Sequence, residues 1–236
     1  VEGIAVGKSP AWMQEALEVY GIRSISGIVD ITNYVTIETG QPLHAFDADK
    51  MEGKELVARQ EHEGEIVETL DGKKIALNPS ALVLSDARNA LDIAGIKGGT
   101  RAEITTKTKN IILTAGNFDG TLIYKTAKRI GITTDASIRF SHNISPALTE
   151  RGMLRALELV IEICGGKAGI VCDAYPKPAK PVPIAFDIER FNALTGLALT
   201  EAHCFAALKK LGFAVSGNKV TPPIERTDIQ RFEDVA

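Results

Sequence analysis

The sequence predicts an α+β protein in which a larger module with a mixed sheet is followed by a smaller second domain. Over residues 1–178, segments with apolar residues at helical spacing alternate with short runs of β-branched residues. Four prolines then fall within residues 176–183, and a segment of this composition forms an extended, semi-rigid connector. We therefore place a domain boundary between residues 178 and 179, so that residues 179–236 form the second domain.

The composition is that of an ordinary globular protein, with 44% hydrophobic and 24% charged residues in a chain of 236. A net charge of −3 argues against a nucleic-acid binder that works by charge alone. The three cysteines lack CxxC spacing, so we expect no metal site. With no apolar run of about 18 residues, we expect no membrane span. The chain begins with Val1 rather than Met, and we expect a piece of a longer polypeptide.

The first helix is predicted to start with Ser9 as N-cap and Pro10 in its first turn. Gly21 suits its C-terminal cap. The apolar residues at helical spacing within it are Trp12, Ala16, Val19 and Tyr20. Residues 27–35 are rich in β-branched residues and fit either a buried strand or the start of a helix, and periodicity does not decide between them. The Gly-Gln-Pro triplet at 40–42 ends that element.

The middle of the chain is predicted to be rich in strands. Residues 65–77 form a hairpin, because Asp71-Gly72 supplies the positive φ angles that a tight turn needs. Residues 81–84 and 110–113 are short apolar strands. Between these strands, the glycine-rich residues 95–99 form a turn in which small residues permit close approach of the backbone.

Two helices follow in the first module. Residues 121–130 form a helix capped by Gly131, and its Lys125, Lys128 and Arg129 belong either to a solvated face or to a surface that contacts RNA phosphates. A longer helix starts at Ser145-Pro146 and ends at Gly165-Gly166. Its predicted inner stripe consists of Leu154, Leu157, Val160, Ile161 and Cys164.

The second domain is predicted to contain a strand near 183–186, a helix near 188–194 and a helix over 201–211. A β-ribbon then runs over residues 213–220 and turns at Gly217-Asn218. Two helices followed by a ribbon are typical of a winged-helix-like domain, here without its C-terminal part. Because glutamates offset its lysines, we expect this domain to pack against neighbouring domains rather than to bind DNA.

No motif for a nucleophile or a zinc site is present, and residues 3–9 have too few residues between their glycines for a phosphate-binding loop. The distinctive stretch is 29–47, where Asp30, Asn33, Gln41 and His44 are embedded among apolar residues. Polar groups in such surroundings must find hydrogen-bond partners if they are buried. From the residues alone, His44 is either a hydrogen-bonded core histidine or a functional one.

Residues 29–47 resemble the signature of the bacterial-type phenylalanyl-tRNA synthetase β chain, D-x-TNYV-x(4)-GQPLHAFD. The similarity covers nearly the whole chain and continues in further segments. These are residues 69–72, 93–99, 117–119, 126–131, 134–140, 191–196, 208–213 and 226–229. The resemblance implies that residues 1–178 are the editing (tRNA-binding) module of that β chain, and that residues 179–236 are part of the winged-helix-like domain that follows it.

The resemblance also implies a function, the hydrolysis of tyrosine wrongly attached to the tRNA for phenylalanine. Matched by position, His44 is the candidate catalytic residue, through a polarised or positioned water. The matched substrate-binding residues are Asn33, Gly98, Thr114, Thr134 and Ala136. Thr114 departs from the family, which usually has a glutamate there to accept the hydrogen of the tyrosine hydroxyl. A neutral hydroxyl accepts a weaker hydrogen bond than a carboxylate does.

For the whole synthetase, the resemblance implies an α-chain partner that charges tRNA(Phe) with phenylalanine. ATP and magnesium serve that reaction, and we expect no cofactor in this segment. The expected assembly is a cytoplasmic α2β2 heterotetramer without membrane or DNA contacts. Three alternatives stay open: an editing-deficient RNA-binding or structural module of the same synthetase, a binding module without chemistry, and a free-standing deacylase.

Overall fold

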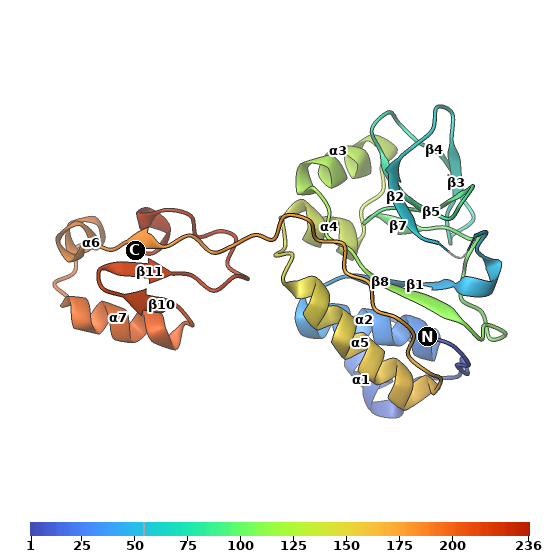
Figure 1. Ribbon diagram of the computed structural model, residues 1–236, viewed down its shortest axis with the longest axis horizontal. Coiled ribbons are helices and arrows are strands. Elements are labelled where there is room, and N and C mark those ends of the chain that lie inside the picture. Colours follow the sequence, from blue (N-terminus) through green and yellow to red (C-terminus); the bar gives the residue numbers. More distant parts are fainter. Residues whose placement is uncertain (54) are drawn as a thin grey trace. The chain divides into compact units, whose positions relative to one another are not determined.

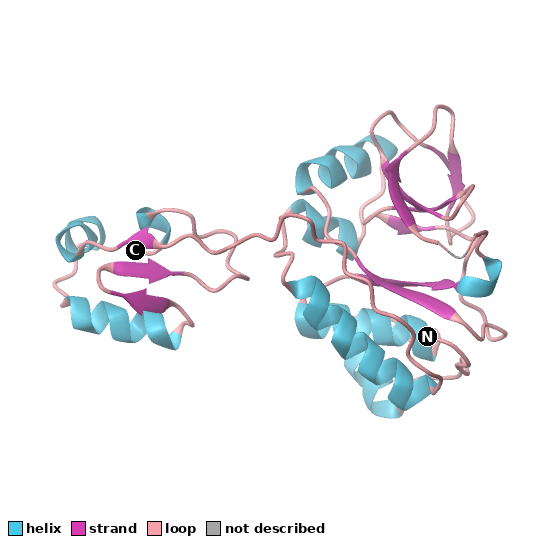
Figure 2. Cartoon of the chain, viewed as in Figure 1, coloured by secondary structure: helices cyan, strands magenta, loops and turns pink. Residues whose placement is uncertain are grey.

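The computed structural model describes residues 1–53 and 55–236, which fall into two compact units (Figure 1). The first unit comprises Val1–Ile144 and Leu148–Cys172, and the second comprises Ser145–Ala147 and Asp173–Ala236. Helices and antiparallel strands are present in both units, which confirms the α+β class (Figure 2). The prediction of a mixed sheet is wrong, because every strand pair in the described ranges is antiparallel. The domain boundary after residue 178 stays a prediction from the sequence.

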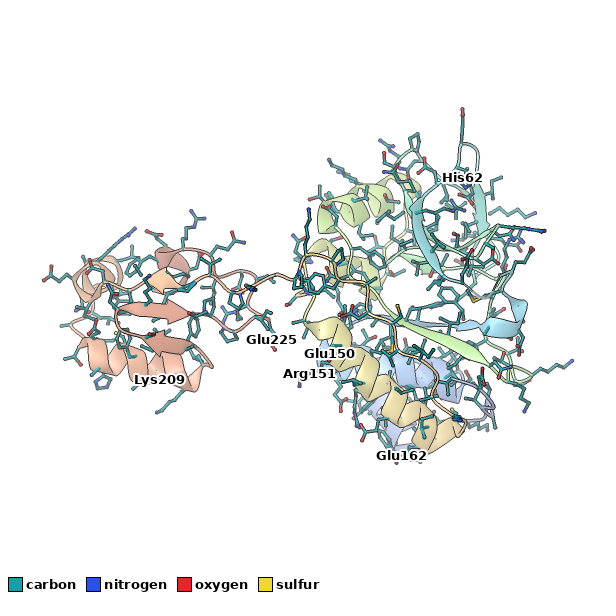
Figure 3. All side chains as sticks on the ribbon, viewed as in Figure 1. His62, Glu150, Arg151, Glu162, Lys209 and Glu225 are labelled. Atoms are coloured by element: carbon teal, nitrogen blue, oxygen red, sulfur yellow. The ribbon has the colours of Figure 1, made fainter. Side chains whose placement is uncertain are left out.

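One side of the first unit is a layer of three helices: α1 (Ala11–Val19), α2 (Gly27–Thr39) and α5 (Leu148–Cys164). Residues 27–35, which the sequence left open, are therefore helical, and Gly40 ends α2 in the left-handed conformation with a φ of 81°. The helices share a core with contributions from Leu17, Ile31 and Leu159. The charged side chains Glu150, Arg151 and Glu162 of α5 are exposed (Figure 3).

A two-stranded ribbon covers this helical layer. Strand β1 (Leu43–Asp47) pairs antiparallel with β8 (Ile111–Ala115), and Phe46 lies opposite Ile112. Side chains alternate between the two faces of a strand. Ala45 and Ile111 accordingly point into the helical core, while Phe46 belongs to a separate cluster on the other face. The ribbon thus lies between the helices and the remaining strands of the unit (Figure 1).

Beyond the ribbon lies a four-stranded antiparallel sheet in the order β2-β5-β6-β7. Its strands are β2 (Val57–Gln60), β5 (Leu82–Ser85), β6 (Ala90–Ile93) and β7 (Lys97–Gly98). The predicted hairpin is confirmed as β3 (Ile66–Glu68) and β4 (Lys74–Ala76), with Gly72 at a φ of 79° in its turn. The predicted turn over residues 95–99 contains β7, which is too short to be visible as alternation in the sequence.

The four-stranded sheet has two differently packed faces. On one face, Val83 and Ile93 lie opposite each other and pack with Ile123 and Phe140. Those two partners come from α3 (Gly120–Ile130), which ends at Gly131 as predicted, and from α4 (Asp135–Ser141), which the sequence did not reveal. On the other face, Leu84 packs in a cluster with Phe46 of β1. This second face therefore looks toward the ribbon.

The second unit contains the strand, the two helices and the ribbon that the sequence predicts. Its elements are β9 (Ile184–Ala185), α6 (Ile188–Thr195), α7 (Glu201–Lys210), β10 (Ala214–Ser216), β11 (Lys219–Thr221) and the 3-10 helix η2 (Phe232–Asp234). The strands form an antiparallel sheet in the order β10-β11-β9. Phe186 lies at the centre of its core, with ring centroids 5.3–5.9 Å from Phe191, Phe205 and Phe232. The winged-helix comparison stays a prediction.

The buried faces of α1 and α5 differ in part from the apolar residues at helical spacing in the sequence. In α1 the buried residues are Met13 and Leu17, whereas Val19 is 91% exposed. In α5 the predicted Val160 and Cys164 are buried together with Ala156 and Leu159, whereas Leu154 and Ile161 are exposed. Apolar residues on adjacent stripes of a helix satisfy the same periodicity, so contact with the neighbouring helices decides which stripe is inside.

Ser9 is not the N-cap of α1, because the helix begins at Ala11 after Pro10 and has no side-chain cap. The hydroxyl of Ser9 instead donates a hydrogen bond to Oδ2 of the buried Asp30 in α2. Asp30 also accepts from the hydroxyl of Ser24 and from the backbone N–H of Ile25, at 2.8 Å for the latter. The carboxylate therefore fixes the loop that joins α1 to α2. None of the helices in the described ranges is long and apolar enough to cross a membrane.

Candidate active site

His44 and Thr114 lie side by side on the two strands of the ribbon. They form a cross-strand pair, and the Thr114 hydroxyl donates a hydrogen bond to the His44 carbonyl oxygen at 3.2 Å. The ring of His44 lies edge-on against Phe46, two residues further along β1, with centroids 4.5 Å apart. Because Phe46 points toward the four-stranded sheet, His44 and Thr114 do so as well.

Gly98 on β7 lies directly against the imidazole of His44. A Cβ atom at position 98 would be 2.9 Å from Cε1 and 3.5 Å from Nε2 of His44, and 3.0 Å from Cδ1 of Leu70. Only glycine therefore lets the ring take this position without displacing a neighbour. The structure thus brings together His44, Gly98 and Thr114, which are far apart in the sequence.

Burial lowers the pKa of His44 from its ordinary value of 6.5 to about 4. The imidazole is therefore neutral at pH 7, with one nitrogen protonated and the other free to accept a hydrogen bond. Neither ring nitrogen is hydrogen-bonded to any residue in the described part of the chain. The ring is thus available to bind a water or a polar ligand group.

Thr134 and Ala136 lie at the start of α4, next to the turn that leads to Gly98. The Thr134 hydroxyl caps α4 by accepting from the backbone N–H of Ser137 at 3.1 Å. It also donates to the carbonyl oxygen of Ile96 at 2.8 Å. Ala136 packs against the cluster that contains Ile96. These two residues therefore hold the turn in place, and the Thr134 hydroxyl already has a donor and an acceptor within the chain.

Asn33 is the site candidate that the structure does not tie to the others. It lies in α2 and is half-buried. Its side-chain amide forms no hydrogen bond with any of the residues that the structure describes. Its donors and acceptor thus remain available to a ligand, whereas the contacts of the other candidates already link them around the ribbon and β7.

Gln41 is a buried motif residue with a structural role. Its Nε2 donates to the carbonyl oxygens of Pro42 and Gly116, both at 2.8 Å, and so ties the start of β1 to the chain that leaves β8. A Cβ at Gly152 of α5 would be 2.8 Å from Cγ of Gln41, so glycine is needed there. In the sequence, the only indication of a role for Gln41 is its position three residues before His44 in the motif.

Asp92 is the residue near His44 that the sequence analysis missed. It lies on β6, is only 5% exposed, and faces Gly98 across the strand pair. Burial raises its pKa from 3.8 to about 7. The sequence could have indicated Asp92, because it is an acidic residue within the otherwise apolar run Ala90–Ile93.

In the described ranges no group of three or more histidine, cysteine or acidic side chains is placed to hold an ion. The three cysteines are free, with Cys164 and Cys204 buried and Cys172 exposed. Around His44 and Gly98 the structure places the hydroxyl of Thr114, the carboxyl group of Asp92 and backbone groups.

Comparison with known proteins gives two family matches. The model described as the B3/4 domain matches residues 1–165, and the model described as the tRNA synthetase B5 domain matches residues 184–236. The phenylalanine–tRNA ligase beta subunit of Geobacter sulfurreducens is 39% identical over 242 residues, covering 100% of this chain and 30% of that protein. The beta subunit from Moorella thermoacetica is 39% identical over 233 residues, covering 97% of this chain and 29% of that protein.

The chain thus spans about 30% of the length of the curated relatives it matches. Among solved structures, an N-terminal fragment of the phenylalanyl-tRNA synthetase beta subunit from Pyrococcus horikoshii has a TM-score of 0.41 and 14% identity. That match covers 100% of this chain and 69% of the other.

Proposed function

The chain belongs to the B3/4 domain family, and from that premise we propose that it is a segment of a phenylalanyl-tRNA synthetase β chain that hydrolyses tyrosine from mischarged tRNA(Phe). The order of the two matched domains and the similarity over the full chain to phenylalanine–tRNA ligase beta subunits support the first part of this proposal. The grouping of His44, Gly98 and Thr114 between the ribbon and β7 supports the second part.

A separate editing site has a physical reason. Tyrosine exceeds phenylalanine by one hydroxyl, and an apolar pocket rejects such an addition only by about a hundredfold. A second site with buried polar groups reverses the selection, because phenylalanine leaves those groups without a partner. The polar side chains beside the apolar Phe46 and Leu70 fit such a pocket.

The single observation that carries the proposal is the state of His44. Its imidazole is half-buried and neutral, lies against Gly98, and has no hydrogen bond to the described residues. In the proposed reaction it positions or polarises the water that attacks the ester carbonyl carbon. The bond between that carbon and the ribose oxygen then breaks, which releases tyrosine and the free ribose hydroxyl. Backbone N–H groups near Gly98 would stabilise the developing oxyanion.

The test is hydrolysis of tyrosyl-tRNA(Phe) and of phenylalanyl-tRNA(Phe) by the whole enzyme that contains this chain. We expect rapid, tyrosine-selective release by the wild type. We expect a loss of at least about a hundredfold in His44→Ala, as for removal of a group that activates water. Unchanged release by a folded His44→Ala enzyme would exclude His44 as an essential participant.

A second candidate function is an editing-deficient RNA-binding or structural module of the same synthetase. The observation in its favour is Thr114, whose hydroxyl proton already bonds the His44 carbonyl oxygen. No tyrosine release by the wild type, together with restored release in Thr114→Glu, would favour this second function.

The remaining features of the whole synthetase are part of the same proposal. We propose that an α chain carries the charging site for ATP, magnesium and phenylalanine, and that tRNA(Phe) and this α chain are the partners of a cytoplasmic α2β2 heterotetramer. The names of the relatives and the tRNA synthetase B5 match support the synthetase role. Copurification of an α chain with the full-length β chain tests the partnership.

A further inference from the structure

We propose that Asp92, rather than Thr114, is the residue that recognises the tyrosine hydroxyl in this site. The inference rests on the proposed editing function and makes it more specific. Asp92 lies on β6, whereas Thr114, the position that the resemblance implies, lies on β8.

The direction of the Asp92 side chain follows from the register of the sheet. Asp92 lies opposite Leu84 of β5 on one side and opposite Gly98 of β7 on the other. Directly opposite residues of antiparallel strands point to the same face, with Cβ atoms about 4.5–5.5 Å apart. Leu84 packs with Phe46, so this is the face that looks toward β1. The neighbouring Ile93 points the other way, into the cluster with Ile123.

The same register places the carboxyl group near the imidazole. The missing side chain of Gly98 would point at His44, 2.9 Å from Cε1. Asp92 lies one strand away from Gly98 on that face, about 5 Å across the sheet. His44 on the ribbon and Asp92 on the sheet are therefore both neighbours of Gly98.

Asp92 has unused hydrogen-bonding capacity. Its Oδ1 accepts one long hydrogen bond, 3.3 Å from the backbone N–H of Leu84, where the pairing of β5 with β6 shifts register. Its Oδ2 forms no hydrogen bond with the residues in the described ranges. Asp86, a buried carboxylate between β5 and β6, accepts instead from the backbone N–H groups of Glu52, Arg88 and Asn89 at 2.8–3.0 Å. Asp86 is thus a satisfied structural group, and Asp92 is not.

A tyrosine hydroxyl would supply the hydrogen-bond donor that Oδ2 of Asp92 lacks among the described residues. The phenol proton would be donated to the free carboxyl oxygen, whereas phenylalanine would leave a buried polar group without a partner. Thr114 is less suited to this role, because its hydroxyl donates to the backbone and can offer only a neutral acceptor. Burial raises the pKa of Asp92, and its single hydrogen bond from the Leu84 backbone N–H offsets this only in part.

The test compares Asp92→Asn with the wild type in the whole enzyme, with tyrosyl- and phenylalanyl-tRNA(Phe) as the two substrates. Asparagine keeps an oxygen that can accept from Leu84, so the fold is retained, and it removes the carboxylate. We expect the ratio of tyrosine to phenylalanine release to fall about tenfold or more, the effect of losing one strong hydrogen bond. Asp86→Asn is the matched control, expected to lower thermal stability and leave the ratio unchanged.

The outcomes separate the two proposals. If the wild type releases tyrosine selectively and a folded Asp92→Asn enzyme keeps the same ratio, the inference about Asp92 is wrong and the editing function stands. If the same ratio falls instead in Thr114→Val, Thr114 is the recognising residue, and the inference is again wrong. If the wild type releases no tyrosine, the editing function fails, and the inference fails with it.

Discussion

The two faces of the four-stranded sheet differ in what they bury. Toward α3 and α4, Val83 and Ile93 pack with Ile123 and Phe140, and the interaction is apolar contact. Toward the ribbon, Leu84 and Phe46 form a similar cluster, but Asp92 lies among these apolar residues. A buried carboxyl group weakens a core unless something satisfies it. The comparison teaches that one face consists of apolar contacts that stabilise the fold, while the other buries a carboxyl group at some cost in stability, which we ascribe to the proposed site.

The largest expected effect concerns the apolar face. Ile93→Ala removes a fully buried side chain, and we expect it to lower the free energy of unfolding by about 2–5 kcal/mol. Equilibrium unfolding in urea measures this, and the fluorescence of Trp12, the single tryptophan, reports on the first unit. The folded fraction should keep its tyrosine selectivity. A cost below about 1 kcal/mol would show that this face is not the main source of stability.

The second prediction concerns the contact between the sheet and the ribbon. Gly98→Ala places a Cβ 2.9 Å from the His44 ring, so we expect a loss of about 1–3 kcal/mol through overpacking. Tyrosine release should fall as well, because the imidazole must move. Gly7→Ala is the matched control, since a Cβ there meets open space. Equal behaviour of the two variants would contradict the close approach of Gly98 and His44.

The third prediction concerns the pH dependence of stability, because the pKa values of His44 and Asp92 are shifted in opposite directions. Below pH 6.5 the unfolded chain protonates His44 before the folded chain does, so His44 costs stability as the pH falls toward about 4. Above pH 3.8 the unfolded chain ionises Asp92 first, so Asp92 costs stability as the pH rises toward about 7. For each of the two groups, the free energy of unfolding changes by at most about 1.4 kcal/mol per pH unit.

In the wild type the pH dependences of stability caused by His44 and by Asp92 oppose each other. A variant that removes one of the two groups leaves only the effect of the other. Between pH 4.5 and 6.5, His44→Gln should lose stability relative to the wild type as the pH rises, whereas Asp92→Asn should gain it. Urea unfolding at several pH values in this range measures both trends. Parallel curves for the wild type and Asp92→Asn would mean that Asp92 titrates normally and is not buried as described.

The smallest expected effect on stability concerns basic residues on α3, which lie outside both faces of the four-stranded sheet. Lys125, Lys128 and Arg129 are exposed on α3, and Lys128 lies 5.9 Å above the ring of Tyr124. Lys128→Glu should change the free energy of unfolding by no more than about 0.5 kcal/mol. The salt dependence of tRNA binding then decides between the two interpretations of this cluster. A reduced slope would indicate phosphate contact, and an unchanged slope would indicate a solvated face.

Local signals in the sequence predicted the elements whose ends depend on backbone preferences. The turn at Asp71-Gly72 and the helix end at Gly131 are both confirmed, because glycine permits the positive φ that each requires. The motif also directed attention to His44. The sequence could not show that Thr114 lies opposite His44, since that pairing joins residues 70 positions apart.

The tertiary structure decided which surfaces are inside. Met13 rather than Val19 is buried in α1, because the neighbouring helices select one of two adjacent apolar stripes. The position of Asp92 near His44 became evident only from the register of the sheet, which places Asp92 between Leu84 and Gly98. The sequence alone was enough to predict the family, the two-part organisation and most elements, since these depend on local residue patterns, while the boundary after residue 178 stays a prediction. The placement of polar groups around His44 depends on contacts between distant segments, and no local pattern encodes them.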